Sequence, residues 1–286
     1  MPKRKKPITG NSIPKSILLF FSILQRLSTS LTVKLASRLF KTPIKYKTPK
    51  REFLMDQKSK QKLVYIPKIE KQIMTYVYGE GSKKILLVHG WSGRGTQLVK
   101  IADKLIDQGY STISFDAPAH GKSPGNTTLM PEFIESILEL EKKYGPFDYA
   151  VGHSLGSMSI LNAIKEGLQI KKAVIIGSGD SVNDILKDFV SNLKLKPNIA
   201  TKMRALFEKK YQIDMESYSA YIAAKKCPIP ILIIHDVNDE DVPYTASENI
   251  HKNLKNSTLL LTEKLGHRKI LGNEKVVETI IHFFKQ

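Results

Sequence analysis

A chain of 286 residues is longer than most single domains, but one α/β domain can reach this size, and an apolar fraction of 41% excludes wholesale disorder. A single cysteine, Cys227, excludes an internal disulfide framework, and no Cys/His cluster has the spacing of zinc ligands. The net charge of +18 is uneven, because residues 1–60 hold 15 Lys and Arg but only Glu52 and Asp56 as acids, which leaves a mildly basic body.

The chain begins with a basic segment and continues with a helical one. The first fifteen residues are basic and contain three prolines, so we expect them to be disordered or loosely tethered. Ser16 to Lys41 predicts one or two helices, because its apolar residues recur at spacings of one, three and four. They are Ile17, Phe20, Phe21, Leu24, Leu27, Leu31, Leu35 and Leu39. We therefore expect residues 1–58 to form an N-terminal extension and residues 59–286 to form the main domain.

The role of this extension is left open by its sequence. Its apolar run, Ile17 to Leu24, is about eight residues long against the roughly 20 that a membrane span needs, and lengthening it would bury Arg26. Residues 16–41 either pack on the body of the protein, dock as a basic amphipathic helix on an anionic membrane surface, or are cleaved as a targeting segment. We expect a cytoplasmic protein, and the second of these interpretations would place it at the inner membrane surface. No nucleic-acid partner is expected, because a short run such as KRKK is usually a solvated terminus.

From Lys60 onward, short apolar strands alternate with amphipathic helices. The predicted strands are KLVYIP (62–67), KQIMTYVYG (71–79), KILLVHG (84–90), YSTISFD (110–116), FDYAVG (147–152), KAVIIG (172–177), IPILIIHD (229–236) and NSTLLLTE (256–263). The predicted helices cover residues 95–108, 130–143, 154–166, 246–254 and 274–284. This alternation indicates an α/β fold with a mostly parallel, eight-stranded sheet covered by helices on both faces.

One stretch, residues 179–226, interrupts the alternation. It holds helical patches and no strand candidate, so we expect a helical lid at about residues 180–226, over the carboxyl edge of the sheet. Its apolar residues either line an acyl pocket or seat the lid on the sheet. They are Ile185, Leu186, Phe189, Val190, Met203, Leu206 and Phe207.

The pentapeptide GHSLG, residues 152–156, is a G-x-S-x-G directly after a predicted strand and directly before a predicted helix. A turn this tight requires small flanking residues, and it raises the hydroxyl of Ser154 above the sheet edge. The positive end of the following helix favours negative charge that develops at the serine. The alternative is a helix N-cap serine in a closely packed turn. The strand–turn–helix context favours a nucleophile.

Together with GHSLG, two later segments make the chain from about Leu63 onward similar to the α/β-hydrolase superfamily, in particular to its lidded esterases, lipases and aminopeptidase-like enzymes. IPILIIHDVNDEDVP resembles the family's H-G-x-x-D-x-x-V-P segment, which implies that Asp239 is the acid. LLLTEKLGHRKIL resembles the final strand followed by Gly-His, which implies that His267 is the base. The order Ser154, Asp239, His267 is the one expected for this fold. Three neighbouring carboxylates remain rival acids: Asp236, Glu240 and Asp241.

The resemblance also implies an oxyanion hole. One backbone N–H comes from Leu155, just after the serine, and the other comes from Trp91 in the segment HGWSG, residues 89–93. FDAPAHGKS, residues 115–123, resembles the family's D-x-x-G-H-G-x-S loop, so we expect His120, like His89, to have a structural role.

These residues predict a serine hydrolase that cleaves an acyl bond, most simply a carboxylic ester, and that requires neither cofactor nor metal. Ser154 attacks the carbonyl, His267 moves the proton, and Asp239 orients the imidazole. The expected partner is a small-molecule acyl substrate whose identity the sequence does not specify. Amides, small peptides and thioesters use the same chemistry, and a non-catalytic binding protein on the same fold is the alternative from another class.

Overall fold

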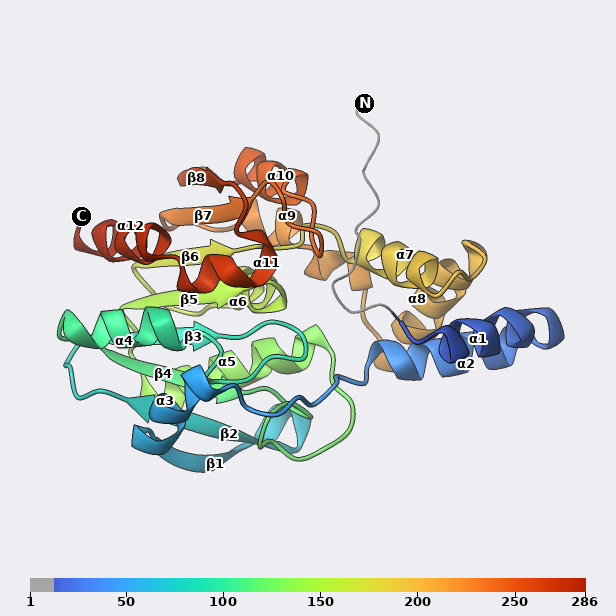
Figure 1. The fold of residues 1–286 in the computed structure, drawn as a ribbon, viewed down its shortest axis with the longest axis horizontal. Helices are drawn as coiled ribbons and strands as arrows, with labels where there is room; N and C mark the ends of the chain where they lie inside the picture. Colours follow the sequence, from blue (N-terminus) through green and yellow to red (C-terminus); the bar gives the residue numbers. More distant parts are fainter. Residues whose placement is uncertain (1–12) are drawn as a thin grey trace.

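A computed structural model describes residues 13–286, and most of the segment that we expected to be disordered lies outside this range. Eight strands form a single sheet in the order β1-β2-β4-β3-β5-β6-β7-β8 (Figure 1). The strands are β1 (Lys60–Ile66), β2 (Lys71–Tyr78), β3 (Lys84–Val88), β4 (Ser111–Asp116), β5 (Tyr149–His153), β6 (Lys172–Ile176), β7 (Ile231–Asp236) and β8 (Ser257–Thr262). β2 alone runs opposite to the other strands of the sheet, so the eight-stranded, mostly parallel sheet is confirmed.

The helices are α1 (Lys15–Leu27), α2 (Thr29–Phe40), α3 (Phe53–Lys58), α4 (Val99–Asp107), α5 (Met130–Tyr144), α6 (Leu155–Lys165), α7 (Val182–Asn192), α8 (Asn198–Tyr211), α9 (Ala220–Ala224), α10 (Thr245–Asn253), α11 (Gly266–Lys269) and α12 (Glu274–Lys285). Short 3-10 turns lie at Lys50–Glu52, Pro67–Ile69, Met215–Tyr218 and Ile270–Gly272. None of the helices within residues 13–286 is both long enough and apolar enough to cross a bilayer.

The central strands of the sheet are buried on both faces, because their alternate residues point to opposite sides and pack under helices, whereas much of β1 is exposed. In β3, Ile85 and Leu87 pack into a cluster with α4 and α12, whereas Leu86 and Val88 pack into a second cluster with α5 and α6. The apolar runs without polar alternation are thus explained by burial on two sides.

Four helices form a lobe beside the sheet: α7 and α8 from the segment between β6 and β7, and α1 and α2 from the N-terminal extension (Figure 1). Ser28 separates α1 from α2, because its extended backbone ends the first helix and its hydroxyl accepts the Leu31 N–H of the second. The ring of Phe40, at the end of α2, lies 5.0 Å from that of Phe189 and 5.8 Å from that of Phe207. One face of the N-terminal helices therefore packs on the body, as the first of the three interpretations expects.

Candidate active site

Ser154 lies at the sharp turn between β5 and α6. Its φ of 54° and ψ of −118° are a combination that residues other than glycine rarely adopt. Backbone strain of this kind costs on the order of 1–3 kcal/mol and is concentrated at functional sites. The flanking glycines make the turn possible, because a Cβ on Gly156 would overlap the carbonyl oxygen of Val88 and one on Gly152 would lie 2.7 Å from the amide nitrogen of Ser157. The turn thus brings the serine to the wall of a cavity and to the N-terminus of α6.

Asp239, after β7, and His267, in α11, are joined by a hydrogen bond of 2.6 Å between Oδ2 and Nδ1. A carboxylate only accepts, so Nδ1 carries the proton and Nε2 is the basic nitrogen of the neutral ring. The end of β6 places this pair beside the serine: the Ser154 N–H donates to the carbonyl of Ile176, and a Cβ on the next residue, Gly177, would lie 3.2 Å from the His267 ring.

Ser154 and the imidazole of His267 are not hydrogen-bonded to each other in this structure. Within residues 13–286, the Ser154 hydroxyl donates no hydrogen bond to the His267 ring. Such contacts are often long in the absence of substrate and tighten when substrate binds.

The carboxyl group of Asp239 is almost fully enclosed and heavily hydrogen-bonded. Its Oδ1 accepts the N–H groups of Asp241 and Val242, both at 2.8 Å. Burial raises the pKa of Asp239, but the hydrogen bonds from His235 and His267 and the attraction of His267 outweigh it and hold the pKa well below its ordinary value. Asp239 is therefore charged at neutral pH, and the imidazole is oriented by a fixed anion.

Two of the three rival acids, Asp236 and Asp241, have other contacts. Asp236 accepts hydrogen bonds from Thr262, Leu265 and the Asn238 amide, so its carboxylate holds the ends of β7 and β8 together. Asp241 lies 3.5 Å from Arg268. Among the carboxylates that the sequence left as alternatives, Asp239 is the one hydrogen-bonded to His267.

Two histidines to which the sequence assigned no role support this arrangement. His153 Nε2 donates to the backbone carbonyl of His267 at 2.9 Å, and the two rings lie 4.6 Å apart. Burial lowers the pKa of His153 to about 3, so the ring is neutral. His235 Nε2 lies 3.3 Å from Asp239 Oδ2, and its Nδ1 accepts the hydroxyl of Ser247. In the sequence, these contacts were indicated only by the position of His153 directly before the serine and of His235 near the end of β7.

The loop after β3 brings Trp91 to the same cavity. Gly90 allows its approach, because a Cβ there would lie 3.0 Å from the Cβ of Ser154. Within residues 13–286, the N–H groups of Trp91 and Leu155 donate to no other group, and both residues line the cavity. Two amides near the serine are thus unused by the fold, as an oxyanion hole requires.

Two more buried histidines hold this loop. His120 Nε2 accepts the Ser92 N–H, and its Nδ1 donates to the carbonyl of Pro118. His89 Nε2 accepts the Ala117 N–H. Burial lowers the pKa of His120 to about 4 and that of His89 well below its ordinary value, so both are neutral. Their contacts agree with the structural roles that we expected.

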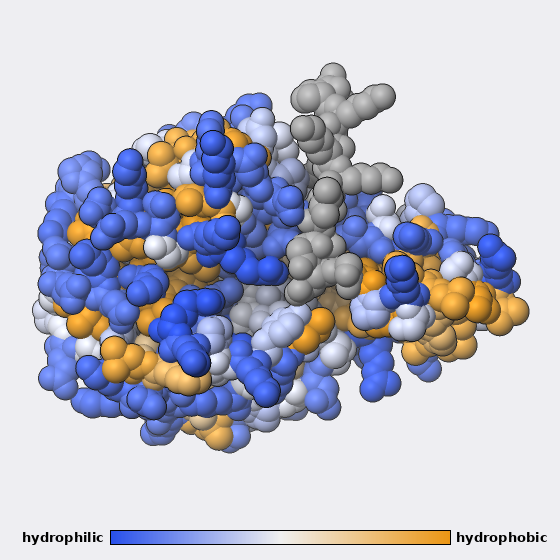
Figure 2. All heavy atoms as spheres, viewed as in Figure 1, coloured by the Kyte–Doolittle hydropathy of each residue, from blue (hydrophilic) through white to orange (hydrophobic). Residues whose placement is uncertain are grey.

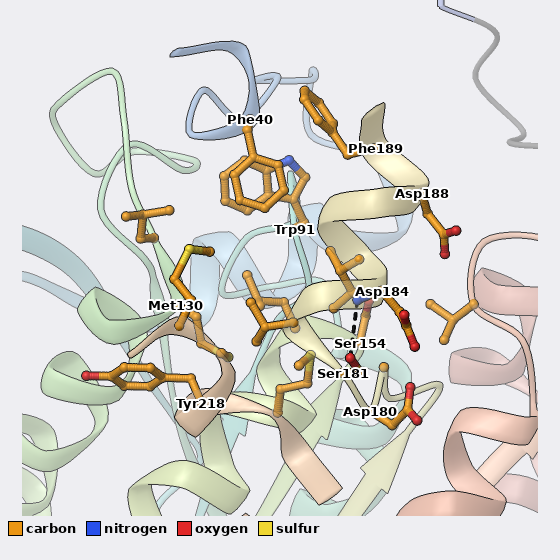
Figure 3. Close-up of a pocket in the computed structure, with 18 of the residues that line it drawn as sticks. Phe40, Trp91, Met130, Ser154, Asp180, Ser181, Asp184, Asp188, Phe189 and Tyr218 are labelled. Atoms are coloured by element: carbon orange, nitrogen blue, oxygen red, sulfur yellow. Dashed lines mark hydrogen bonds between the residues drawn. The ribbon is translucent and has the colours of Figure 1, made fainter. Parts of the chain in front are cut away.

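A cavity of about 360 Å³ extends from Ser154 into the helical lobe (Figure 3). Of the seven apolar residues of the helical segment, Ile185, Phe189 and Phe207 line it. Leu186, Val190 and Met203 are instead buried in the core, and Leu206 is exposed. Leu39 and Phe40 complete the wall, so α2, from the extension, forms part of the cavity, which the sequence did not predict. Within residues 13–286, no group of three or more His, Cys, Asp and Glu side chains is arranged to hold a metal ion.

Comparison with known proteins agrees with this architecture. Residues 83–214 match the family model of the α/β-hydrolase fold, and residues 213–286 match that of TAP-like proteins. With the eight-stranded sheet and the many similar structures, these matches show that the chain belongs to the α/β-hydrolase superfamily. Both matches begin after the N-terminal helices. Comparison of the sequence with curated proteins gave no match.

Similar solved structures have different activities. A bromoperoxidase from Bacillus anthracis is 19% identical, with a TM-score of 0.61 over 79% of this chain and 100% of its own. An esterase from Exiguobacterium antarcticum is 18% identical, with a TM-score of 0.60 over 76% and 97%. Proline iminopeptidase from Mycobacterium smegmatis is 13% identical, with a TM-score of 0.60 over 79% and 98%. At these identities the likeness concerns the fold, so the reaction of this α/β-hydrolase-fold protein has to be inferred from its own site.

Proposed function

We propose that the protein is a serine hydrolase that cleaves carboxylic esters with an apolar acyl group. The observation that carries the proposal is Ser154, in a strained turn at the cavity wall, beside an imidazole whose other nitrogen is hydrogen-bonded to the buried Asp239 carboxylate. A serine hydroxyl is a weak nucleophile until a neighbouring base takes its proton, and His267 Nε2 is the base available here.

In the proposed mechanism, Ser154 Oγ attacks the ester carbonyl and its proton passes to His267 Nε2. The tetrahedral oxyanion accepts the N–H groups of Trp91 and Leu155, and the nearby N-terminus of α6 favours its charge. The bond to the alkoxy group then breaks, and the leaving alcohol takes the proton from Nε2. Water then attacks the acyl-enzyme while His267 Nε2 takes its proton. Nε2 returns that proton to Ser154 Oγ as the acid is released. Asp239 keeps the imidazole in the required tautomer and stabilises its cation.

The acyl group is assigned from the cavity wall. Apolar side chains from α2, α5, α6, α7 and the loop after β3 surround the space next to Ser154, and Figure 3 shows Phe40, Trp91 and Met130 among them. A pocket of this size and character suits a hydrocarbon chain.

An amide substrate with a free amino group is the second candidate. Four carboxylates also line the cavity, Asp180, Asp184, Asp188 and Asp241, although each already interacts with another group of the protein. Thioesters would use the same residues.

The test is hydrolysis of p-nitrophenyl esters from acetate to palmitate, with aminoacyl p-nitroanilides beside them. We expect ester turnover to fall by at least about 10⁴-fold in Ser154→Ala. Ser159→Ala, on the same helix but outside the cavity, should retain activity. Turnover of the anilides alone would move the assignment to amides.

Labelling of the wild-type protein by a fluorophosphonate reports the nucleophile independently of the substrate. If both Ser154→Ala and wild type hydrolyse nothing above background and neither is labelled, the fold serves binding and the proposed chemistry is wrong.

A further inference from the structure

The N-terminal hairpin, α1 and α2, exposes a row of large apolar side chains. Leu19, Phe20, Ile23, Leu27 and Leu31 are between 44% and 78% exposed. Leu19, Phe20, Ile23 and Leu27 recur at three- and four-residue spacings, which places them along one side of α1, and Leu31 lies in the first turn of α2. We call these five residues the hairpin stripe. Figure 2 shows apolar residues gathered at this end of the molecule, over the helical lobe.

The orientation of the hairpin is fixed by its other side. Phe21 and Leu24 are buried in the core cluster. The side chain of Gln25 links α1 to the segment between α7 and α8. It donates a hydrogen bond to the carbonyl of Lys194 and accepts one from the N–H of Lys196. The stripe therefore faces away from the body, and turning α1 to bury it would lose these contacts.

The surface around the stripe is basic. From Ile13 to Arg51 the chain contains no acidic residue, and Lys15, Arg26, Lys34 and Arg38 are exposed on the hairpin. The adjoining lid residues 194–210 add further basic side chains, namely Lys194, Lys196, Lys202, Arg204, Lys209 and Lys210. Their one acid, Glu208, is paired with Arg204.

We propose that the N-terminal hairpin docks the protein on an anionic membrane surface. The stripe enters the boundary between headgroups and acyl chains while the surrounding Lys and Arg contact lipid phosphates, which is the mode of interfacial amphipathic helices. Helices of 13 and 12 residues lie on a bilayer rather than cross it.

Two other occupants fit the surface less well. In a symmetric dimer the stripe would face itself and bring the same lysines and arginines together, with no acid on the hairpin to offset them. A nucleic acid would pair with the cations but would leave the Leu, Ile and Phe side chains in water. A lipid surface satisfies both the charge and the apolar side chains.

Docking of the hairpin would also bring the cavity close to the membrane surface. Leu39 and Phe40, at the end of α2, line the cavity that contains Ser154, so one helix joins the docking surface to the acyl-binding wall. Esters that partition into the membrane are thus the substrates presented to this lobe. This last step rests on the proposed function, whereas the docking itself does not.

The test is co-sedimentation of the full-length chain with vesicles of phosphatidylcholine, with and without about 30 mol % phosphatidylglycerol. We expect binding to the anionic vesicles that weakens as salt increases. The combined change Leu19→Ser, Phe20→Ser, Ile23→Ser and Leu27→Ser should weaken it at least about tenfold. Arg26→Gln with Lys34→Gln should weaken it about twentyfold or more, at roughly fivefold for each charge.

Matched controls lie far from the hairpin. Leu63→Ser with Tyr65→Ser removes two apolar side chains of similar exposure from β1, and Lys252→Gln with Lys255→Gln removes two exposed charges near α10. Both controls should bind like wild type. Circular dichroism and thermal unfolding verify that every variant is folded.

Wild type that stays in the supernatant with anionic vesicles, or a stripe variant that binds as well as wild type, overturns the proposal. So does a dimer in light scattering that the stripe variant dissociates, since the occupant would then be a second copy. Tight binding to duplex DNA without binding to vesicles would assign the basic surface to nucleic acid. None of these outcomes depends on catalysis, so failure here is distinguishable from failure of the hydrolase proposal.

Discussion

Histidines that never meet substrate account for much of the geometry of this site. His153 anchors the backbone of His267, and His235 lies 3.3 Å from the same carboxylate oxygen of Asp239 that accepts the His267 hydrogen bond. A displacement of about 1 Å at a reacting group costs on the order of 10²-fold in rate, so a contact of this kind is expected to appear in turnover. We regard both as positioning residues.

Replacement of His153 tests this directly. His153→Leu leaves the carbonyl of His267 buried without a donor, which costs about 1–3 kcal/mol, and we expect kcat to fall roughly tenfold or more with little change in KM. His153→Gln keeps a side-chain N–H donor and should recover most of kcat. Steady-state kinetics on a soluble short-chain ester measures both. Equal losses in kcat for the two variants would make His153 a packing residue only.

The nucleophile turn shows a second effect at this scale. Gly152 and Gly156 are required by closely approaching backbone atoms, and Ser154 itself has a positive φ without being glycine. The sequence pattern was sufficient to predict the turn, because only small residues fit such a junction.

At the scale of elements, the N-terminal helix α2 is part of the cavity. Phe40 contacts Phe189 of α7 and Phe207 of α8, so three helices meet around one aromatic ring. The family models match from residue 83 onward, so this part of the wall lies outside the matched segments.

Phe40→Ala should therefore change substrate preference rather than chemistry. Removal of the ring enlarges the cavity, and we expect the preferred acyl chain to lengthen and KM for short esters to rise about threefold to tenfold, while fluorophosphonate labelling of Ser154 persists. The chain-length profile of p-nitrophenyl esters measures it. Phe53→Ala, exposed on α3, is the control and should leave the profile unchanged. An identical profile for Phe40→Ala would remove α2 from the acyl site.

At the scale of the whole molecule, the buried histidines make stability depend on pH. His153 and His120 have folded-state pKa values of about 3 and about 4, against 6.5 for an ordinary histidine, and the pKa of His89 is also lowered by burial. Between pH 6.5 and these values the unfolded chain binds the protons and the folded chain does not. The free energy of unfolding should therefore fall as the pH drops, by roughly 1.4 kcal/mol per pH unit for each histidine.

Asp239 acts in the same direction at lower pH. Its depressed pKa stabilises the fold above the ordinary value of 3.8, and this contribution is lost as the pH falls below that value. Urea unfolding at about pH 7.5, 6.5, 5.5 and 4.5 measures how the free energy of unfolding changes with pH. His153→Gln should reduce this slope by roughly 1.4 kcal/mol per pH unit, the contribution of one histidine. A free energy of unfolding that stays constant from about pH 6.5 to 4.5 would contradict the assignment of neutral buried rings.

The sequence by itself predicted the eight strands, the helices between them and the turn at Ser154, whereas Asp239 and His267 were implied by the family resemblance, with three rival acids left open. These depend on local patterns: apolar runs for strands that are buried on both faces, and small residues about a strand-to-helix turn. Their assembly could be inferred because the carboxyl ends of parallel strands meet at one edge.

Only the tertiary structure decided which carboxylate lies against His267, that His153 and His235 support the pair, and that α2 lines the cavity. Each of these is a contact between residues brought together by the fold. Asp236 and Asp239 are three residues apart and chemically identical, so only the path of the loop after β7 separates their roles. Likewise the periodicity of residues 16–41 predicted one apolar stripe, whereas packing on α8 divided those side chains into a buried set and an exposed set. The sequence pattern indicates that one face of a helix is apolar, but only the packing of neighbouring elements determines what covers that face.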